Sequence, residues 1–384
     1  MIGICIKYFH ENYGGMLQAF ATTKLLEKYG IDYEIVRYKK KKDLKFIIKS
    51  LPRIFNNVLL NDKYEALQKK LSFKEHPDMA SNEKIRMQAF DQFRRKNFTK
   101  LSKEYYGFDE LCEGAKKYDA VITGSDQLWS PAGLPTNFYN LMFVPDNIRK
   151  ISLASSFGVK YIPWYQKKRT KEFLNRIEFI SMRENSGQKI VKELTGRDVP
   201  VVLDPVFMFN KDEWEKLIPS KKEYEDEYIF AYFLGKNPEH RKVVKEFAKK
   251  KKLKIVTLRH LDQFVEEDEK FGDYAPYDVG PDKFLNLLRG AKYVFTDSFH
   301  GAVFSIIHKK DFLVFNRYSD TSKHSKNSRI DSLCQNLEIK NCRYNGNIKS
   351  AFLENIDYGK VEKNYKELKA KTDEYIDKAL EGIK

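Results

Sequence analysis

The sequence predicts an α/β protein with two domains, each built on a parallel sheet. Its length of 384 residues exceeds the usual size of a single domain. An apolar run over residues 2–8, a helical pattern over 16–29 and a second apolar run over 33–38 form a strand–helix–strand opening. This order favours parallel strand pairing. The short charged segment 219–227 separates the first series of strands and helices from a second one.

These patterns set the expected domain boundaries. We place the first domain at residues 1–220 and the second at 221–358, followed by a long helical pattern in the C-terminal segment 359–384. Within the first domain, residues 46–117 show helical periodicity with few turn signals, which predicts a helical insertion. The sequence says little about the purpose of this insertion.

The charge of the chain favours anionic partners. The formal net charge is +16, from 70 Lys and Arg against 54 Asp and Glu, and such an excess attracts nucleic acid, anionic lipid or small anions. The excess is mostly lysine spread along the chain, as on a solvated surface without a partner. The basic run 39–45 indicates either a solvated loop or a contact with acidic lipid headgroups, and we favour the loop.

The four cysteines and the lengths of the apolar runs indicate the cellular compartment of the protein. No CxxC pair occurs, which is typical of a reduced cytosolic protein. No apolar run reaches transmembrane length, and the N-terminus lacks the pattern of a signal peptide. We therefore expect a cytoplasmic protein, with peripheral contact at the inner face of the membrane as a further option.

The stretch 293–304 contains the strongest candidate for a functional site. Residues 293–296 predict a buried strand, which Asp297 and Ser298 end. Gly301 permits a tight turn, a helical pattern follows, and His300 would lie at the turn. The N–H groups that begin a helix favour an anion, and an imidazole beside them can move a proton. A capping turn, whose histidine bonds a backbone carbonyl, is an equally good interpretation.

Other predicted strands also end in polar loops, where open α/β sheets bind ligands. After the strand at 120–123 come Gly124, Ser125, Asp126, Gln127 and Trp129, a mixture of carboxylate, amide and aromatic groups that suits a sugar. A structural turn with a buried tryptophan explains this loop nearly as well. The pair Gly14-Gly15 follows the first strand, but it lacks the pattern of a phosphate-binding loop.

Two arginines stand at predicted element boundaries. Arg183 follows the strand 179–182, where its planar donor fork would suit a carboxylate or phosphate, although an ion pair with Glu184 or a helix cap is the alternative. Arg329 lies in the first turn of a helix that Ser328 could cap. Asp204 ends a predicted strand over 201–203.

Taken together, several motifs resemble one family. The chain is similar to the polysaccharide pyruvyl transferases between residue 2 and about residue 337, and six motifs occur in the family's order. They are Asn12-Tyr13-Gly14-Gly15 with Leu17-Gln18-Ala19, then residues 118–129, 180–184, 203–206, 291–304 and 327–330.

The resemblance implies a fold and a reaction. The fold would be two Rossmann-like domains facing across a cleft, as in the B-type glycosyltransferases, with a C-terminal helix that returns to the first domain. The reaction would move the pyruvyl group of phosphoenolpyruvate onto two hydroxyls of a sugar, giving a cyclic ketal. The acceptor would be a sugar or lipid-linked oligosaccharide in cell-surface polysaccharide synthesis. No cofactor and no nucleic acid are expected, and the absence of an HxxE or HxH cluster predicts no metal.

The resemblance also suggests roles for the residues found above. His300 would carry the proton, and the donor would bind at Arg183, Arg329, Ser298, Gly301 and Asp297. The acceptor or the cleft would involve Asn12, Tyr13, Gly14, Gly15, Gln18, Gly124, Ser125, Asp126, Gln127, Trp129, Glu184 and Asp204. Better-studied members carry an arginine two positions before the histidine, where this chain has Ser298. Either Arg183, Arg329 or a lysine replaces that arginine, or the donor differs.

Two other function classes compete with this hypothesis. A nucleotide-sugar glycosyltransferase on the same frame would need an acidic ribose clamp in the second domain, and no strong candidate stands out. A non-catalytic glycan-binding or anion-binding module would scatter its Lys and Arg without a convergent polar site. The clustering of polar motifs at strand ends argues against the module.

Overall fold

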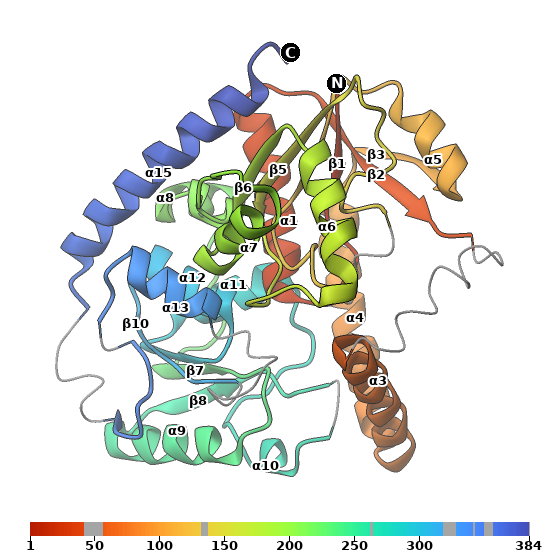
Figure 1. Cartoon of the computed structure of the whole chain (residues 1–384). Coiled ribbons are helices and arrows are strands. Elements are labelled where there is room, and N and C mark those ends of the chain that lie inside the picture. The colour runs from red at the N-terminus through yellow and green to blue at the C-terminus, as the bar shows by residue number, and fades with distance from the viewer. Residues whose placement is uncertain are drawn as a thin grey trace.

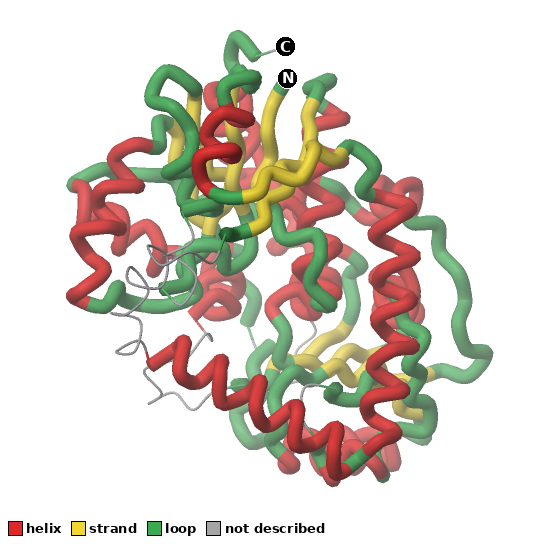
Figure 2. The backbone as a smooth tube through the Cα atoms, turned by 90° about the vertical axis from the view of Figure 1, so that its right-hand side faces the viewer, coloured by secondary structure: helices red, strands yellow, loops and turns green. Residues whose placement is uncertain are grey.

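Two parallel sheets, one above the other, organise the two halves of the chain (Figure 1). The computed structural model describes residues 1–41, 57–131, 137–261, 264–317, 328–340, 342–348 and 356–383. Part of the basic run (42–45) and the start of the predicted insertion (46–56) lie outside the described residues. The two yellow sheets are clearly separate in Figure 2, with helices between and around them. The predicted α/β class with parallel sheets is confirmed.

The first sheet has six strands in the order β3-β2-β1-β4-β5-β6. Every neighbouring pair is parallel, and Ile2 of the central strand is in register with Tyr33 on one side and Ala120 on the other. The strands are β1 (Ile2–Cys5), β2 (Tyr33–Lys39), β3 (Leu101–Tyr106), β4 (Ala120–Gly124), β5 (Arg149–Ser155) and β6 (Phe179–Met182). Strands β1 and β4 are buried throughout because helices cover both faces of the sheet.

The helices of the first half connect or follow these strands. They are α1 (Tyr13–Lys28), α3 (Asn57–Glu75), α4 (Pro77–Asn97), α5 (Phe108–Ala115), α6 (Trp164–Arg176), α7 (Asn185–Thr195), the 3₁₀ helix η3 (Pro205–Met208) and α8 (Lys211–Leu217). Helix α1 begins early because the side chain of Asn12 caps it, accepting a hydrogen bond from the Gly15 amide at 2.8 Å.

The second sheet has four parallel strands in the order β10-β9-β7-β8. They are β7 (Tyr228–Tyr232), β8 (Lys254–Thr257), β9 (Tyr293–Thr296) and β10 (Asp311–Val314). The helices of this half are α9 (Pro238–Lys251), α10 (Glu266–Glu269), α11 (Pro281–Gly290), α12 (Phe299–Ile307) and α13 (Ser328–Asn336). In each sheet the order in which successive strands are added reverses beside the first strand, β1 or β7. In parallel sheets such a reversal leaves a crevice at the carboxyl end of that strand.

One continuous apolar core joins the two halves. The ring of Tyr13 on α1 stacks on Phe284 of α11 with centroids 4.6 Å apart, and its hydroxyl donates to the carbonyl of Val279 at 3.1 Å. Trp214 of α8 meets Phe304 of α12 edge to face. The inner helices of the two halves therefore pack directly on each other, which fixes the two sets of strand-end loops in one place.

The last helix, α15 (Tyr358–Leu380), leaves the second half and lies along the first (Figure 1). The hydroxyl of Tyr375 donates to the Ser152 carbonyl at 2.7 Å, and the Leu203 amide donates to Thr372 Oγ1 at 3.1 Å. Arg149 also donates to the carbonyl of Ala379 at 3.3 Å. Helix α15 thus ties the chain's C-terminal segment to the edge of the first sheet that carries β5 and β6.

Two sequence-based predictions in the first half are wrong. Residues 46–117 are not wholly helical, because β3 forms the edge strand of the first sheet and α5 follows it. The pattern of β3 is weak because only Ser102 and Tyr105 are buried. Residues 201–203 form no strand, but a single bridge between Met182 and Val201, since Pro205 starts η3 directly afterwards.

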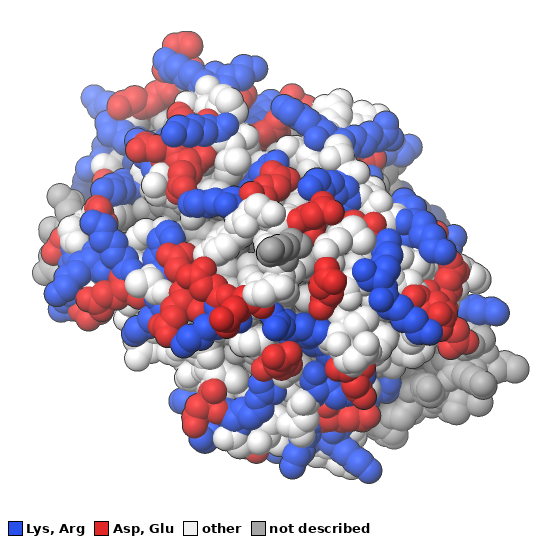
Figure 3. Space-filling view, turned by 90° about the horizontal axis from the view of Figure 1, so that it is seen from above, with Lys and Arg blue, Asp and Glu red and all other residues white. Residues whose placement is uncertain are grey.

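Basic and acidic side chains are mixed over the surface. Figure 3, which looks down on the first half, shows blue and red groups side by side without a large field of one sign. This mixing suits the interpretation of the lysine excess as a solvated surface. In the described part of the chain, no helix combines the length and the apolar character that a membrane span requires.

Candidate active site

A cavity of about 240 Å³ lies where the strand-end loops of the two halves meet. The loops after β1 and β4 line it from the first half, and the loops after β7 and β9 with the starts of α12 and α13 line it from the second. It gathers eight of the predicted residues: Asn12, Gly15, Asp126, Gln127, Asp297, Ser298, His300 and Arg329. A larger groove of about 730 Å³ runs along α15, but none of the predicted site residues lines it.

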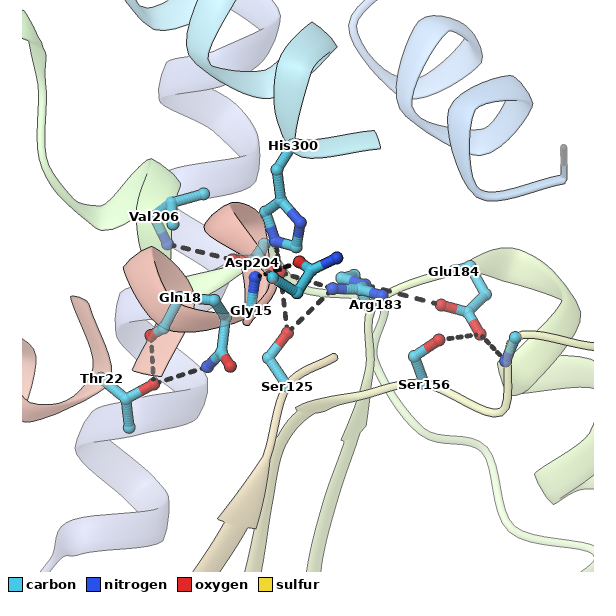
Figure 4. Close-up of polar contacts among 12 residues, drawn as sticks. Gly15, Gln18, Thr22, Ser125, Ser156, Arg183, Glu184, Asp204, Val206 and His300 are labelled. Carbon is cyan, nitrogen blue, oxygen red and sulfur yellow. Dashed lines mark hydrogen bonds and ion pairs between the residues drawn. The ribbon is translucent and has the colours of Figure 1, made fainter. Parts of the chain in front are cut away.

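His300 enters this cavity from the first turn of α12. The helix begins at Phe299, three residues earlier than the pattern predicted, because Ser298 caps it by accepting from the Gly301 amide at 3.3 Å. The ring is largely buried, and its Nε2 lies 3.6 Å from Oδ2 of Asp204 (Figure 4). The histidine is therefore held between the cavity and a buried carboxylate.

Gly14 explains why His300 can reach this position. A Cβ atom built on Gly14 would lie 2.2 Å from Nδ1 of His300, so any larger residue would displace the ring. A Cβ on Gly15 would only touch Asn12 and Asp126 at 3.5 Å, which is ordinary contact. Gly14 is thus needed for a close approach between the two halves.

Asp204 is a fixed anion beneath the histidine. Its Oδ2 accepts from Arg183 Nη1 at 2.7 Å and from Ser125 Oγ at 2.8 Å, while Oδ1 accepts from the Val206 amide at 3.1 Å (Figure 4). Burial alone would raise the pKa of Asp204, but His300 and the Arg183 guanidinium hold it well below its usual range. A carboxylate in this position orients an imidazole and stabilises positive charge that forms on it.

Arg183 does not line the cavity. Its side chain is 2% exposed, bonded to Asp204, and its guanidinium lies 4.6 Å from the centre of the Phe299 ring. The predicted contact of Arg183 with the donor is not seen at this cavity, because a buried carboxylate, Asp204, already pairs with its charge. In this structure Arg183 contacts Asp204 and not the cavity.

The cavity itself contains other charged groups. Arg329, at the start of α13, lines it together with Lys7 and Arg317. Asp126 lies among them, with a positive φ of 53°. Burial acts to raise the pKa of Asp126, but Lys7, Arg183 and other nearby cations hold it at about 2. Burial and Lys7 also lower the pKa of His10, the other histidine at this cavity.

Several predicted cleft residues have structural contacts instead. Gln18 is buried on α1 and donates to Thr22 Oγ1 at 2.7 Å. Trp129 is buried in the core beside β5 and β6, where its indole donates to the Tyr139 carbonyl at 3.0 Å. Tyr13 holds the two halves together, as described above. These three side chains do not line the cavity beside His300.

Four further predicted residues pack behind the cavity and do not line it: Gly124, Gly301, Ser125 and Glu184. A Cβ on Gly124 would lie 2.0 Å from the Leu153 carbonyl oxygen, and one on Gly301 would lie 2.6 Å from Thr296 Oγ1. Glu184 is buried and accepts from Ser156 Oγ at 2.9 Å and from the Gly158 amide at 3.3 Å. These residues fix the loops after β4, β5 and β6 rather than facing the cavity.

Sequence reasoning missed Lys7, Arg317 and Phe299 as site residues. Lys7 was hidden inside the predicted strand 2–8, whereas β1 ends at Cys5 and leaves Lys7 at a strand end. Arg317 follows β10 by three residues, so its place after a strand was the available signal. Phe299 carries no polar group, and only the fold shows that both Arg183 and Arg329 lie against its ring.

No metal cluster is evident in the part of the chain that the structure describes. Within it, no group of three or more His, Cys, Asp or Glu side chains is arranged to hold a metal ion. The chemistry that these residues offer is proton transfer at His300 and anion binding by cations and by the start of α12.

Comparison with solved structures identifies the fold. The chain resembles a putative UDP-N-acetylglucosamine 2-epimerase from Listeria monocytogenes, with a TM-score of 0.50, 13% identity, and coverage of 96% of this chain and 90% of that one. A UDP-N-acetylglucosamine 2-epimerase from Rickettsia bellii gives a TM-score of 0.50 at 9% identity, covering 98% and 95%. These likenesses confirm the two-domain arrangement of the B-type glycosyltransferases and say nothing about substrate.

Sequence comparison identifies the family. No curated protein matches the chain. The family model for polysaccharide pyruvyl transferase matches residues 12–319, which include Asn12 and helix α1, Asp204 and the His300 turn. The predicted resemblance is confirmed over most of the chain, and with it the expectation of a transferase. The protein belongs to the polysaccharide pyruvyl transferase family.

Proposed function

We propose that this protein transfers the pyruvyl group of phosphoenolpyruvate to two hydroxyls of one sugar during cell-surface polysaccharide synthesis. The observation that carries the proposal is His300, whose Nε2 lies 3.6 Å from Asp204 at a cavity lined by Lys7, Arg317 and Arg329. A histidine beside a set of cations suits proton transfer to an anionic enol phosphate, which supports the proposal. We expect the reaction to be cytoplasmic, with the acceptor free or presented on a lipid at the membrane's inner face.

The reaction can be written with all atoms accounted for. A proton added to the methylene carbon of phosphoenolpyruvate makes the neighbouring carbon electrophilic, and a first sugar hydroxyl attacks it and loses its proton. The C–O bond to phosphate then breaks, and a second hydroxyl closes the ketal with loss of its proton. Of the two protons released by the hydroxyls, one replaces the proton taken up by the methyl group and the other leaves with phosphate. His300 is suited to supply the first proton and to accept one from the attacking hydroxyl.

The donor's two anionic groups find suitable partners. Arginine and lysine side chains bind phosphate and carboxylate, and the first N–H groups of a helix favour negative charge. Lys7, Arg317 and Arg329 surround the cavity, and α12 begins at its wall. This supports donor binding without an arginine at position 298, where Ser298 caps the helix instead.

One contact disfavours the nucleotide-sugar alternative. The amides of Leu234 and Gly235, just after β7, both donate to the Asp297 carboxylate at 2.7 Å. In nucleotide-binding α/β sheets, amides after the first strand bind phosphate groups. Here the chain's own carboxylate occupies them, so a nucleotide diphosphate would have to displace Asp297.

Phosphate release tests the proposed reaction. The protein is incubated with phosphoenolpyruvate and a panel of sugars and lipid-linked sugars, and inorganic phosphate is followed by phosphorus NMR. We expect acceptor-dependent release from phosphoenolpyruvate and none when a UDP-sugar replaces it. The His300→Gln variant serves as the control for contaminating phosphatase. Turnover of a UDP-sugar without turnover of phosphoenolpyruvate would reverse the proposal.

A further inference from the structure

A second cavity, of about 300 Å³, adjoins the first and differs from it in composition. The two share His10, Asn12 and Leu234, so they are neighbours across the loop after β1. Tyr232, the last residue of β7, and Phe233, which follows it, also line the second cavity. Its volume reaches the lower end of the range for small-molecule sites, which begins at about 300 Å³.

The helical hairpin of α3 and α4 forms one wall of this second cavity. It contributes Lys69 from α3, and Glu83, Arg86 and Met87 from α4. The opposite wall comes from the second half, including the loop after β8 with Arg259 and His260. The hairpin is thus part of a site, which gives a use to the insertion whose purpose the sequence left open.

Arg86 is the unusual residue of this wall. It is only 8% exposed, and in the described part of the chain no carboxylate lies within ion-pair distance of its guanidinium. Nη1 donates to the Arg259 carbonyl at 2.9 Å and Nη2 to the Pro276 carbonyl at 3.5 Å, while Nε has no partner among the described residues. Carbonyl oxygens satisfy hydrogen bonds but do not neutralise the charge, and a buried charge without a counterion is costly.

The other basic groups of the second cavity are compensated. Lys69 pairs with Glu83, and Arg259 pairs with Glu269 at 3.2 Å. Glu11, the remaining carboxylate at this cavity, lies exposed at its rim. The buried wall therefore keeps the positive charge of Arg86.

We propose that the second cavity binds the acceptor and that Arg86 recognises an oxyanion, a phosphate or a carboxylate, carried by that sugar. The identification of the occupant as the acceptor rests on the proposed pyruvyl transfer, because the first cavity then holds the donor. A phosphate would come from a sugar phosphate or its lipid-linked form, and a carboxylate from a uronic acid. Either anion would supply the counterion that Arg86 lacks among the described residues.

Binding without turnover tests the proposal separately from the reaction. Dissociation constants of glucose 1-phosphate, glucuronic acid and methyl glucoside are measured by calorimetry without phosphoenolpyruvate, so that no transfer can occur, and the Arg86 variants separate binding at this cavity from binding at the first. We expect at least one charged probe to bind about tenfold or more tightly than methyl glucoside, the scale of one charge-assisted contact. Preference for the phosphate or for the uronate identifies the source of the anion.

Variants assign the preference to Arg86. Arg86→Gln should abolish it while leaving methyl glucoside unchanged, and Arg86→Lys should keep most of it. Arg259→Gln is the matched control, because the charge of Arg259 is already paired with Glu269 and the preference should survive. If Arg86→Gln does not fold, Met87→Glu places a negative charge on the same wall and should weaken only the charged probes.

Three results would overturn the proposal: no preference for a charged probe in the wild type, an unchanged preference in Arg86→Gln, or an equal loss for all probes. The last would mark Arg86 as a purely structural tie between α4 and the second half. Failure of pyruvyl transfer itself would appear separately, as the absence of phosphate release with any acceptor.

Discussion

The region beneath His300 and the cavity above it use the same residue types in different ways. Beneath the ring, Arg183, Ser125 and Asp204 form a closed buried network at 2.7–2.8 Å. Above it, Arg329 and Lys7 line a space that can admit a ligand. Two arginines with similar sequence signals, each at the start of an element, can therefore have different partners. Arg183 pairs with a carboxylate of the protein, whereas Arg329 lines a cavity that can admit an anionic substrate.

Loss of the proton carrier between the two regions should have the largest effect. His300→Gln is expected to lower kcat by about a hundredfold to ten-thousandfold, the range for a lost general acid or base. The KM for phosphoenolpyruvate should change little, because the cations that line the cavity remain. Near-normal turnover would exclude His300, and His10 would be tested next.

Displacing the His300 ring while keeping the histidine should lower kcat nearly as much. Gly14→Ala puts a methyl group 2.2 Å from the present position of Nδ1, so the ring must move away from Asp204. We expect kcat to fall by about a hundredfold, a loss typical of a misplaced catalytic group. Gly15→Ala is the matched control, because its new contacts would be ordinary and its loss should be much smaller. Equal losses in both variants would contradict this account of Gly14.

The two arginines should separate stability from donor binding. Arg183→Gln leaves Asp204 buried without its ion pair, so the free energy of unfolding should fall by about 3 kcal/mol or more. Arg329→Gln should raise the KM for phosphoenolpyruvate about tenfold with a change in stability below about 1 kcal/mol. Urea titration and steady-state kinetics measure both. The comparison fails if Arg183→Gln changes only KM, or if Arg329→Gln changes only stability.

Lowering the pH should reduce the stability that Asp204 contributes by a smaller, graded amount. The pKa of Asp204 is lower in the folded protein than the ordinary aspartate value of about 3.9. Its contribution to stability is therefore complete above that value and is lost as the pH falls further towards the folded pKa. Asp204→Asn should flatten the loss of stability below about pH 4. An identical acid profile in the variant would show that the Asp204 charge does not stabilise the fold.

The sequence predicted the elements with strong patterns and missed those whose signal is tertiary. The strand β9 matches its predicted bounds, residues 293–296, because its run of apolar residues is clear. The edge strand β3 was missed since Ser102 is one of only two residues that it buries. The start of α12 was misplaced because the Ser298 cap outweighed the turn signal of Gly301.

The sequence predicted which residues belong to the candidate site better than it predicted what each side chain contacts. The strand-end rule found His300 and Asp126, since parallel strands bring their carboxyl ends together, whereas Arg329 was found from its place at a helix start. The rule could not separate a side chain that faces the cavity from one turned beneath it. Asp204 and Arg183 show this limit, because their mutual hydrogen bond exists only once residues 21 positions apart have been brought together.

Hydrogen isotope transfer tests the central claim most directly, namely that the cleft protonates phosphoenolpyruvate on its methylene carbon. The reaction is run in D₂O with a suitable acceptor, and the product's methyl group is examined by proton and carbon NMR. We expect one deuteron in that methyl group together with released phosphate, and far less of both from His300→Gln over the same time. A product whose methyl group carries no solvent deuteron, or one formed at the normal rate by His300→Gln, would exclude this protonation step.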